Sequence, residues 1–321
     1  MNSDKKPEYV EDLRKYHSFK PGAGEYLVRM LYAPVNPSDY YFMTNLYPLF
    51  KPVNAIAGFE GTGKVVEVGE GGDQSMVGKV VNILLASETQ YGTYATYTVV
   101  PKAMALVVEN PDEDYFKRNP FVLNPLTAIG LKSIIDNSGS KSFVQTGASS
   151  NVGELLTFLA RKEHNSIQII RSEKHRERLK SLGATEILNQ ESPEFDQQLK
   201  EVMKKYQPGV CIDCVAGPMT GKLFNLLPFN GQLVVYGLLS LEPCSGIDPS
   251  SLIFSNRIIR GFHLFEHMLK FKPPSTFKAE LDKVNKEFNA HPNGFEELNV
   301  GDIDKMMSTF NQRTRKFVFK L

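Results

Sequence analysis

The chain has 321 residues, of which 41% are hydrophobic and 23% charged, and its formal net charge is +1. This profile is typical of a folded globular protein, and the length suits two domains. The near-neutral charge, without a long basic block, disfavours nucleic acid and anionic membranes as partners. No apolar run reaches the roughly 20 residues that span a bilayer. The first six residues carry neither a signal-peptide segment nor an Arg-rich presequence.

The N-terminal third of the chain predicts a β-rich domain. Residues 22–30 have a strand-like pattern, and the prolines and polar residues of 34–39 predict a loop after it. Residues 55–100 hold short β-branched runs divided by glycines, which predict further strands. The Gly-Thr-Gly sequence at 61–63 resembles a nucleotide-binding loop, but no helical pattern follows it, so we interpret it as a barrel strand. Residues 101–123 predict a loop-rich crossing.

A turn in the middle of the chain predicts a nucleotide site. The apolar run that starts at residue 142 stops at Gly147, and small polar residues, Gly153 and a helical apolar pattern follow. This order is typical of a dinucleotide-binding unit, in which a close backbone and a helix N-terminus hold the pyrophosphate. A strand, turn and helix without a ligand would read the same. Ser150 and Asn151 stand where another glycine is common, although Asn tolerates left-handed backbone better than most residues.

Further strand and helix patterns follow this turn. Strands predicted at 166–170, within 182–188, at 210–215 and at 231–237 alternate with helices, which predicts a parallel, doubly wound sheet.

The residues after the second of these strands predict the choice of cofactor. An NAD enzyme usually has an acidic residue there, whereas this chain has Arg171, followed by Ser172, Lys174 and Arg176. A cation suits a 2′-phosphate, so the sequence predicts NADPH rather than NADH. The alternative is a solvated helix face, which fits Arg176 better than Arg171.

Two short motifs indicate other chemistry. Cys211 and Cys214 form a C-x-x-C, but within a strand these positions face opposite ways, so we expect reduced thiols. His263, Glu266 and His267 fit an inverted zinc-peptidase signature, which belongs on a helix. Here the signature follows a strand-like run. We therefore expect His263 at a strand end beside the cofactor and His267 at the surface.

The chain end returns to the first domain. Helices are predicted near 277–288 and 302–310, followed by a closing strand at 316–321. The predicted domains are thus 1–123 with 266–321, and 124–265.

These segments together resemble the medium-chain dehydrogenase/reductase superfamily. Within it they resemble the zinc-free branch of quinone oxidoreductases and mitochondrial 2-enoyl thioester reductases. The resemblance covers residues 24–321 and rests on the order and spacing of short pieces. These pieces lie at 24–29, 36–39, 46–48, 58–63, 92–95, 124–128, 147–153, 182–184, 213–217, 235–237 and 260–262. Those at 36–39 and 260–262, with 251–254, favour the enoyl reductases.

The resemblance implies an α/β fold and a set of site residues. A GroES-like β-barrel catalytic domain would be built from both chain ends, with a Rossmann doubly wound parallel sheet inserted between them. NADPH would be the cofactor, the protein would be a homo- or heterodimer joined through the Rossmann sheet, and its location would be mitochondrial, with the cytoplasm as the alternative. The proton donor falls on Tyr47. The implied cofactor contacts are Asn124, Ser149, Ser150, Asn151, Val152, Arg171, Ser172, Tyr236, Gly237, Phe262, His263, Leu264 and Lys316.

Tyr47 also has a chemical reason to be the donor. Hydride attack on an enoyl thioester develops an enolate, which needs a proton. A phenol, with a reference pKa near ~10, is protonated at pH 7. Asn36 and Ser38 are weak acids suited to positioning, and Asp39 is expected to accept hydrogen bonds within the loop. The alternative is that Tyr47 only packs beside its sequence neighbours.

Two classes of function stay open. One is an NADPH-dependent reductase that transfers hydride to an activated C=C bond, with a trans-2-enoyl thioester preferred and an enone or quinone as alternatives. The other is a structural or accessory subunit of a larger complex, which the altered glycine turn favours. Zinc is not expected, because Asn36 and Phe59 take the positions of zinc ligands in the zinc-dependent branch, and three cysteines cannot build a four-cysteine lobe.

Overall fold

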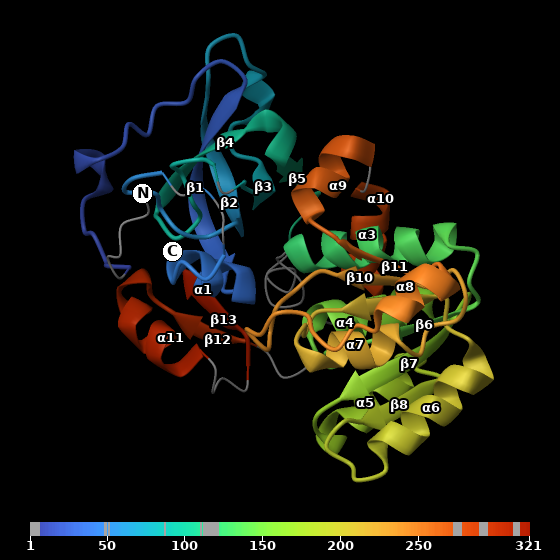
Figure 1. Ribbon diagram of the computed structural model, residues 1–321. Coiled ribbons are helices and arrows are strands. Elements are labelled where there is room, and N and C mark those ends of the chain that lie inside the picture. Colours follow the sequence, from blue (N-terminus) through green and yellow to red (C-terminus); the bar gives the residue numbers. More distant parts are fainter. Residues whose placement is uncertain are drawn as a thin grey trace. The chain divides into compact units, whose positions relative to one another are not determined.

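The computed structural model describes residues 7–47, 50, 52–86, 88–109, 111, 122–271, 278–288, 295–310 and 315–321. The chain divides into two compact units, Met1–Leu123 with Lys272–Leu321, and Asn124–Phe271 (Figure 1). The second boundary lies at Phe271 rather than at residue 265, because helix α9 (Leu264–Phe271) continues the second unit. None of the helices in these ranges combines the length and the apolarity that a bilayer crossing needs.

The first unit is built on a seven-stranded sheet in the order β12-β13-β1-β2-β3-β5, with β4 also paired to β1. Its long strand β1 buries alternate residues, among them Val28 and Met30, against the core. Helix α11 (Ile303–Thr309) lies beside β12 and β13 and buries Met306 there (Figure 1). The strands are β1 (Glu25–Pro34), β2 (Glu60–Val68), β3 (Val80–Leu84), β4 (Tyr97–Pro101), β5 (Ala105–Val107), β12 (Glu296–Leu298) and β13 (Phe317–Lys320).

Helix α1 (Pro37–Met43) corrects the loop predicted at 34–39. Proline is a helix breaker in the interior, but at the first helical position its missing N–H costs nothing. Asp39 also accepts a hydrogen bond from the backbone N–H of Asn36 at 2.7 Å, which closes the start of the helix. The crossing at 101–123 holds a 3-10 turn, η3 (Lys102–Met104), and β5, while residues 110 and 112–121 lie outside the described part.

The remaining helical segments of the first unit are short. The helices predicted near 277–288 and 302–310 are present as α10 (Lys278–Glu287) and α11, the latter preceded by a 3-10 turn. That turn is η6 (Val300–Asp302), and two more 3-10 turns of this unit are η1 (Leu13–Lys15) and η2 (Gln74–Met76).

The second unit is a six-stranded, wholly parallel sheet in the order β11-β10-β9-β6-β7-β8. Counted from β6, this is the 3-2-1-4-5-6 order of the Rossmann fold, with its switch point between β6 and β9. The strands are β6 (Ser142–Gln145), β7 (Asn165–Ile170), β8 (Glu186–Asn189), β9 (Val210–Asp213), β10 (Gln232–Val235) and β11 (Ile258–Gly261). The predicted doubly wound sheet is confirmed.

Helices cover this sheet, and several begin at a strand's carboxyl end. Buried side chains of β6, β7 and β9 pack against α6, which lies beside β8 (Figure 1). The helices are α3 (Leu123–Asn137), α4 (Asn151–Ala160), α5 (Arg176–Ser181), α6 (Phe195–Tyr206), α7 (Pro218–Phe224), α8 (Pro249–Ser255) and α9, with the 3-10 turn η4 (Glu173–His175) before α5.

Candidate functional site

The turn between β6 and α4 keeps its shape without the usual middle glycine. Gly147 has φ +56°, and a Cβ there would lie 2.4 Å from the Cys214 sulfur. A Cβ on Gly153 would lie 2.6 Å from the Ala148 carbonyl oxygen, so these two positions require glycine. Ser150 has φ −75° and caps α4 by accepting a hydrogen bond from the Gly153 N–H at 3.1 Å. Asn151 is already helical, so the left-handed backbone considered for it is not used.

The same turn presents backbone donors to an anion. Within the described chain, the N–H groups of Ser149, Asn151 and Val152 donate no hydrogen bond. They stand at the N-terminus of the ten-residue helix α4, where the helix dipole adds positive potential. Ser149, Ser150 and Asn151 are half-buried. The arrangement can bind a pyrophosphate.

Arg171 and Lys174 provide two uncommitted cations after β7. Both side chains are exposed, and neither forms an ion pair or hydrogen bond with another described residue. Ser172, between them, is half-buried. By contrast, Arg176 donates to Glu173 at 3.0 Å and to the Ile187 carbonyl at 2.9 Å. Arg171 and Lys174 are therefore available to bind a phosphate. Arg176 instead links the turn at Glu173 to strand β8.

The other predicted cofactor contacts of the second unit gather at the carboxyl ends of strands. Tyr236 and Gly237 follow β10, and Phe262 and His263 follow β11. Burial, with a smaller contribution from the neighbouring Cys214, raises the pKa of the Tyr236 phenol well above its ordinary value. In a parallel sheet these strand ends share one edge, where ligands bind.

His263, Leu264 and Asn124 lie in different environments. His263 is exposed, Leu264 is buried and begins α9, and Asn124 lies in the first turn of α3. His267 is half-buried against the Phe262 ring, at 5.1 Å between centroids, which corrects its predicted surface position.

The two C-x-x-C cysteines are buried free thiols. Cys211 belongs to the sheet core, and Cys214 lies under the glycine turn beside Gly147. Burial raises the pKa of the Cys214 thiol to about 11, and it also raises the pKa of the Cys211 thiol well above its ordinary value. Because the thiolate is the reactive form, this environment opposes redox chemistry at the pair.

Lys316, by contrast, is held inside the first unit. Its ammonium donates to the Asn36 side-chain oxygen at 2.7 Å and lies 4.0 Å from a Glu60 carboxylate oxygen. Glu60 is fully buried; it accepts from the Asn36 amide at 2.7 Å and from the backbone N–H groups of Val122 and Leu123 at 2.8 and 2.7 Å. The sequence analysis missed Glu60. A lone acidic residue in the otherwise uncharged run 52–63 was the available signal.

Tyr47 follows α1 and is half-buried. Its ring meets the Tyr41 ring at 5.4 Å with a 68° tilt. Burial, with smaller contributions from Tyr41 and Asp39, raises its pKa to about 12. The phenol is therefore protonated throughout the physiological range. The packing against Pro48 that the alternative required lies outside the described residues.

Asp39 accepts hydrogen bonds from the backbone N–H groups of Asn36 and Phe59, at 2.7 and 2.9 Å, as expected for a structural acceptor. Burial raises its pKa from the ordinary 3.8 to about 6. The folded state thus holds a proton that the unfolded state has lost, so this group makes stability fall as pH rises from about 4 to 6, by on the order of 3 kcal/mol.

We expect Asp39→Asn to remove most of that pH dependence. Unfolding free energies measured at pH 4, 5, 6 and 7 for the wild type and the variant give the difference, and an exposed acid on β2, Glu67, supplies the control variant Glu67→Gln. An unchanged slope in Asp39→Asn would assign the titration to another group.

The residues considered for zinc have other contacts. The Asn36 side chain donates a hydrogen bond to Glu60 and accepts one from Lys316. Phe59 packs edge-on against Phe42, with ring centroids 5.0 Å apart. Asn is a poor zinc ligand and Phe is none.

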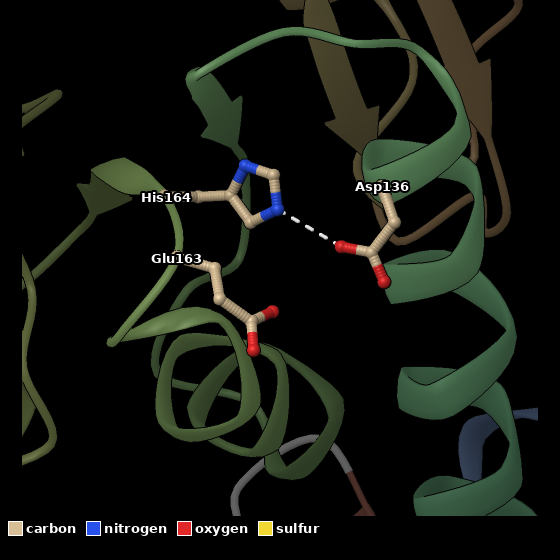
Figure 2. A group of neighbouring side chains, drawn as sticks. All are labelled: Asp136, Glu163 and His164. Atoms are coloured by element: carbon tan, nitrogen blue, oxygen red, sulfur yellow. Dashed lines mark hydrogen bonds and ion pairs between the residues drawn. The ribbon is translucent and has the colours of Figure 1, made fainter.

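Over the described ranges, one group of three metal-ligand side chains comes together, Asp136, Glu163 and His164 (Figure 2). The Lys132 ammonium donates to Asp136 at 2.9 Å and also forms an ion pair with Glu163. Both carboxylates therefore already have Lys132 as a cationic partner.

The first unit also contains a cavity of about 1110 Å³. Residues 7–14 and 16–20 line it, together with other residues that include Phe42, Met43 and Phe319. None of the predicted site residues lines it.

Comparisons with known proteins agree with this geometry. The family described as "Alcohol dehydrogenase GroES-like domain" matches residues 22–112, and "Zinc-binding dehydrogenase" matches 153–286. The mitochondrial enoyl-[acyl-carrier-protein] reductase of Caenorhabditis elegans is 31% identical over 251 residues, which are 76% of this chain and 70% of that protein. The chain belongs to the medium-chain dehydrogenase/reductase superfamily.

Within that superfamily it falls in the zinc-free branch of enoyl reductases and quinone oxidoreductases, as the resemblance predicted. The mitochondrial enoyl-[acyl-carrier-protein] reductase of Arabidopsis thaliana is 32% identical over 244 residues, 74% of this chain but only 64% of the relative. A solved structure described as an NADPH:quinone reductase, from Mesorhizobium loti, superposes with a TM-score of 0.82 at 29% identity, covering 94% of this chain and 88% of that one.

Proposed function

We propose that the protein is an NADPH-dependent reductase that adds hydride to the activated C=C bond of a trans-2-enoyl thioester, and that it acts in mitochondria. The observation that carries the proposal is the intact turn before α4, with free N–H groups at Ser149, Asn151 and Val152. It argues against a catalytically degenerate subunit, because the turn keeps its shape with serine at position 150. The backbone of Ser150 has φ −75°, which does not require glycine. The names of the relatives support the substrate class and the location.

Each residue has a defined task in this reaction. The turn before α4 would hold the pyrophosphate, and Arg171 the 2′-phosphate. When bound, NADPH supplies the hydride for the β-carbon of the thioester. Tyr47 keeps a proton on its oxygen at neutral pH, donates it to the α-carbon as the enolate collapses, and regains one from solvent. One hydride and one proton are added, and a saturated thioester results.

Activity measurements decide between the open alternatives. We expect purified protein to oxidise NADPH with crotonyl-CoA and to show little turnover with a short quinone. Turnover with the quinone alone would support the reductase class of the Mesorhizobium structure. Binding of NADPH without turnover on either acceptor would support an accessory subunit.

Arg171→Ala should weaken NADPH binding roughly ten- to a hundredfold and leave NADH nearly unchanged. A charge-assisted contact with a phosphate contributes about 1.5–3 kcal/mol, and the uncommitted guanidinium of Arg171 is free to make it. Titration calorimetry with both cofactors measures the difference. Lys180→Ala is the control, because Lys180 already pairs with Glu177 at 2.9 Å. Equal losses for both cofactors would make Arg171 merely structural.

We also propose that a second subunit covers the free edge of β11. This strand ends the parallel sheet, and Ile258 on it is 54% exposed. Helix α8, which precedes it in the chain, exposes Ile253 and Phe254 by 70% and 77%. An open edge beside exposed apolar side chains is typical of a protein interface.

The pair of substitutions Ile253→Asp and Phe254→Asp should therefore shift a dimer toward monomer. Light scattering coupled to size-exclusion chromatography measures the mass, with Val77→Asp, an exposed valine of the first unit, as the control. A monomeric wild type, or an unchanged dimer in the double variant, would contradict the assignment.

A further inference from the structure

An ion pair links the helices that stand behind the two predicted phosphate sites. Glu154 lies in the first turn of α4, the helix that starts at the pyrophosphate turn. Arg178 lies in α5, which follows the segment carrying Arg171. The Arg178 Nε and Glu154 Oε2 atoms are 3.1 Å apart, and the two side chains are only 30% and 13% exposed.

The neighbouring ion pairs do not make such a link. Arg176 pairs with Glu173, three residues away, and Lys180 pairs with Glu177, also three residues away. The Lys180 and Glu177 side chains are 56% and 82% exposed, so solvent screens that pair. The Glu154–Arg178 pair is better shielded and joins two different helices.

Glu154 is badly placed for an anion site unless its charge is cancelled. Its Cα lies three residues beyond Asn151, roughly 4.5 Å along the helix axis. An uncompensated carboxylate there would compete with a phosphate for the positive helix end and repel it, well inside the ~10 Å range over which salt screens charges. Burial raises the pKa of Glu154, whereas Arg178 acts to lower it. The positive charge of Arg178 thus offsets the repulsion between an ionised Glu154 and a phosphate at the start of α4.

We propose that Glu154 and Arg178 are a positioning pair for the dinucleotide, in which Arg178 cancels the Glu154 charge beside the pyrophosphate and fixes α4 against α5. The inference rests on the proposed NADPH site and adds two residues that need not touch the cofactor. Because the pyrophosphate is common to both dinucleotides, loss of Arg178 affects NADP⁺ and NAD⁺ alike. That pattern differs from the NADPH-selective loss expected for Arg171→Ala.

The test uses the full chain with Arg178→Met, Glu154→Gln and the double variant. Titration calorimetry with NADP⁺ and NAD⁺ at pH 8 gives affinities, and thermal unfolding of the free proteins gives stability. Arg178→Met should weaken both cofactors about tenfold. The double variant should recover most of the affinity, and Lys180→Met, the control on the same helix, should behave as the wild type.

Several results would overturn the proposal. Wild-type affinity in a folded Arg178→Met would do so, as would a double variant that binds as weakly as Arg178→Met. If Arg178→Met does not fold, the test rests on Glu154→Gln alone. Charge cancellation predicts that this variant keeps or raises the affinity for NADP⁺ and NAD⁺, so a tenfold loss would refute it. A wild type that binds neither dinucleotide would instead reject the NADPH site itself.

Discussion

Replacing Glu60 by Ala should lower the free energy of unfolding of the first unit by about 3–5 kcal/mol, the cost of breaking a buried charge network. The carboxylate is fully buried and engages Asn36, the Lys316 ammonium and the backbone N–H groups of Val122 and Leu123. Its loss removes one partner from a nearly buried ammonium and the carboxylate acceptor from two backbone donors. Each unsatisfied buried donor costs about 1–3 kcal/mol.

Urea unfolding followed by far-UV circular dichroism measures this loss, since the chain has no Trp. Glu67→Ala is the matched control, because Glu67 lies on the same strand but is exposed. Lys316→Met should destabilise by a similar amount, and Glu60→Gln combined with Lys316→Met should recover part of the loss because no unpaired charge remains.

The same variants separate two roles for Lys316. The resemblance implies a cofactor contact, whereas the structure commits the ammonium to Asn36 and Glu60. If Lys316→Met loses NADP⁺ affinity while its unfolding curve matches the wild type, the ammonium serves the cofactor and the buried network is not what holds the barrel.

The parts of the fold that local pattern determines were predictable. Short apolar strands alternating with helices predict the parallel sheet, because each strand must be followed by a helix that covers it. Helix α1 was mistaken for a loop because Pro37 was interpreted as a breaker, although the hydrogen bond from Asn36 to Asp39 makes it a helix start. The residue types were visible, but their position relative to the helix was not.

Contacts between distant residues were not predictable from pattern. Asn36 and Lys316 are 280 positions apart, and no periodicity signals that one will hold the other. Likewise, the sequence favoured Arg171 over Arg176 for the phosphate, but only the fold shows which partners engage Arg176 and Arg178, while Arg171 and Lys174 have none among the described residues. Pairing depends on which elements the sheet order brings together.

Tyr47→Phe should lower turnover on an enoyl thioester by about 10²–10⁴-fold, the usual contribution of a positioned proton donor. The substitution removes one oxygen and keeps the ring that meets Tyr41. Affinity for NADPH should stay nearly unchanged, because the groups expected to bind it lie in the second unit, apart from Lys316. Steady-state kinetics with crotonyl-CoA, together with NADP⁺ titration, measure both quantities.

The raised pKa sets the pH profile of this role. A phenol with a pKa of about 12 stays protonated across the range in which the protein is folded and assayed, so Tyr47 itself should cause no alkaline loss of turnover below about pH 10. Tyr41→Phe is the control, since it removes a hydroxyl from the neighbouring ring and should keep most of the activity. Full activity of Tyr47→Phe, or an equal loss in Tyr41→Phe, would leave Tyr47 as a packing residue and assign the proton to another group or to water.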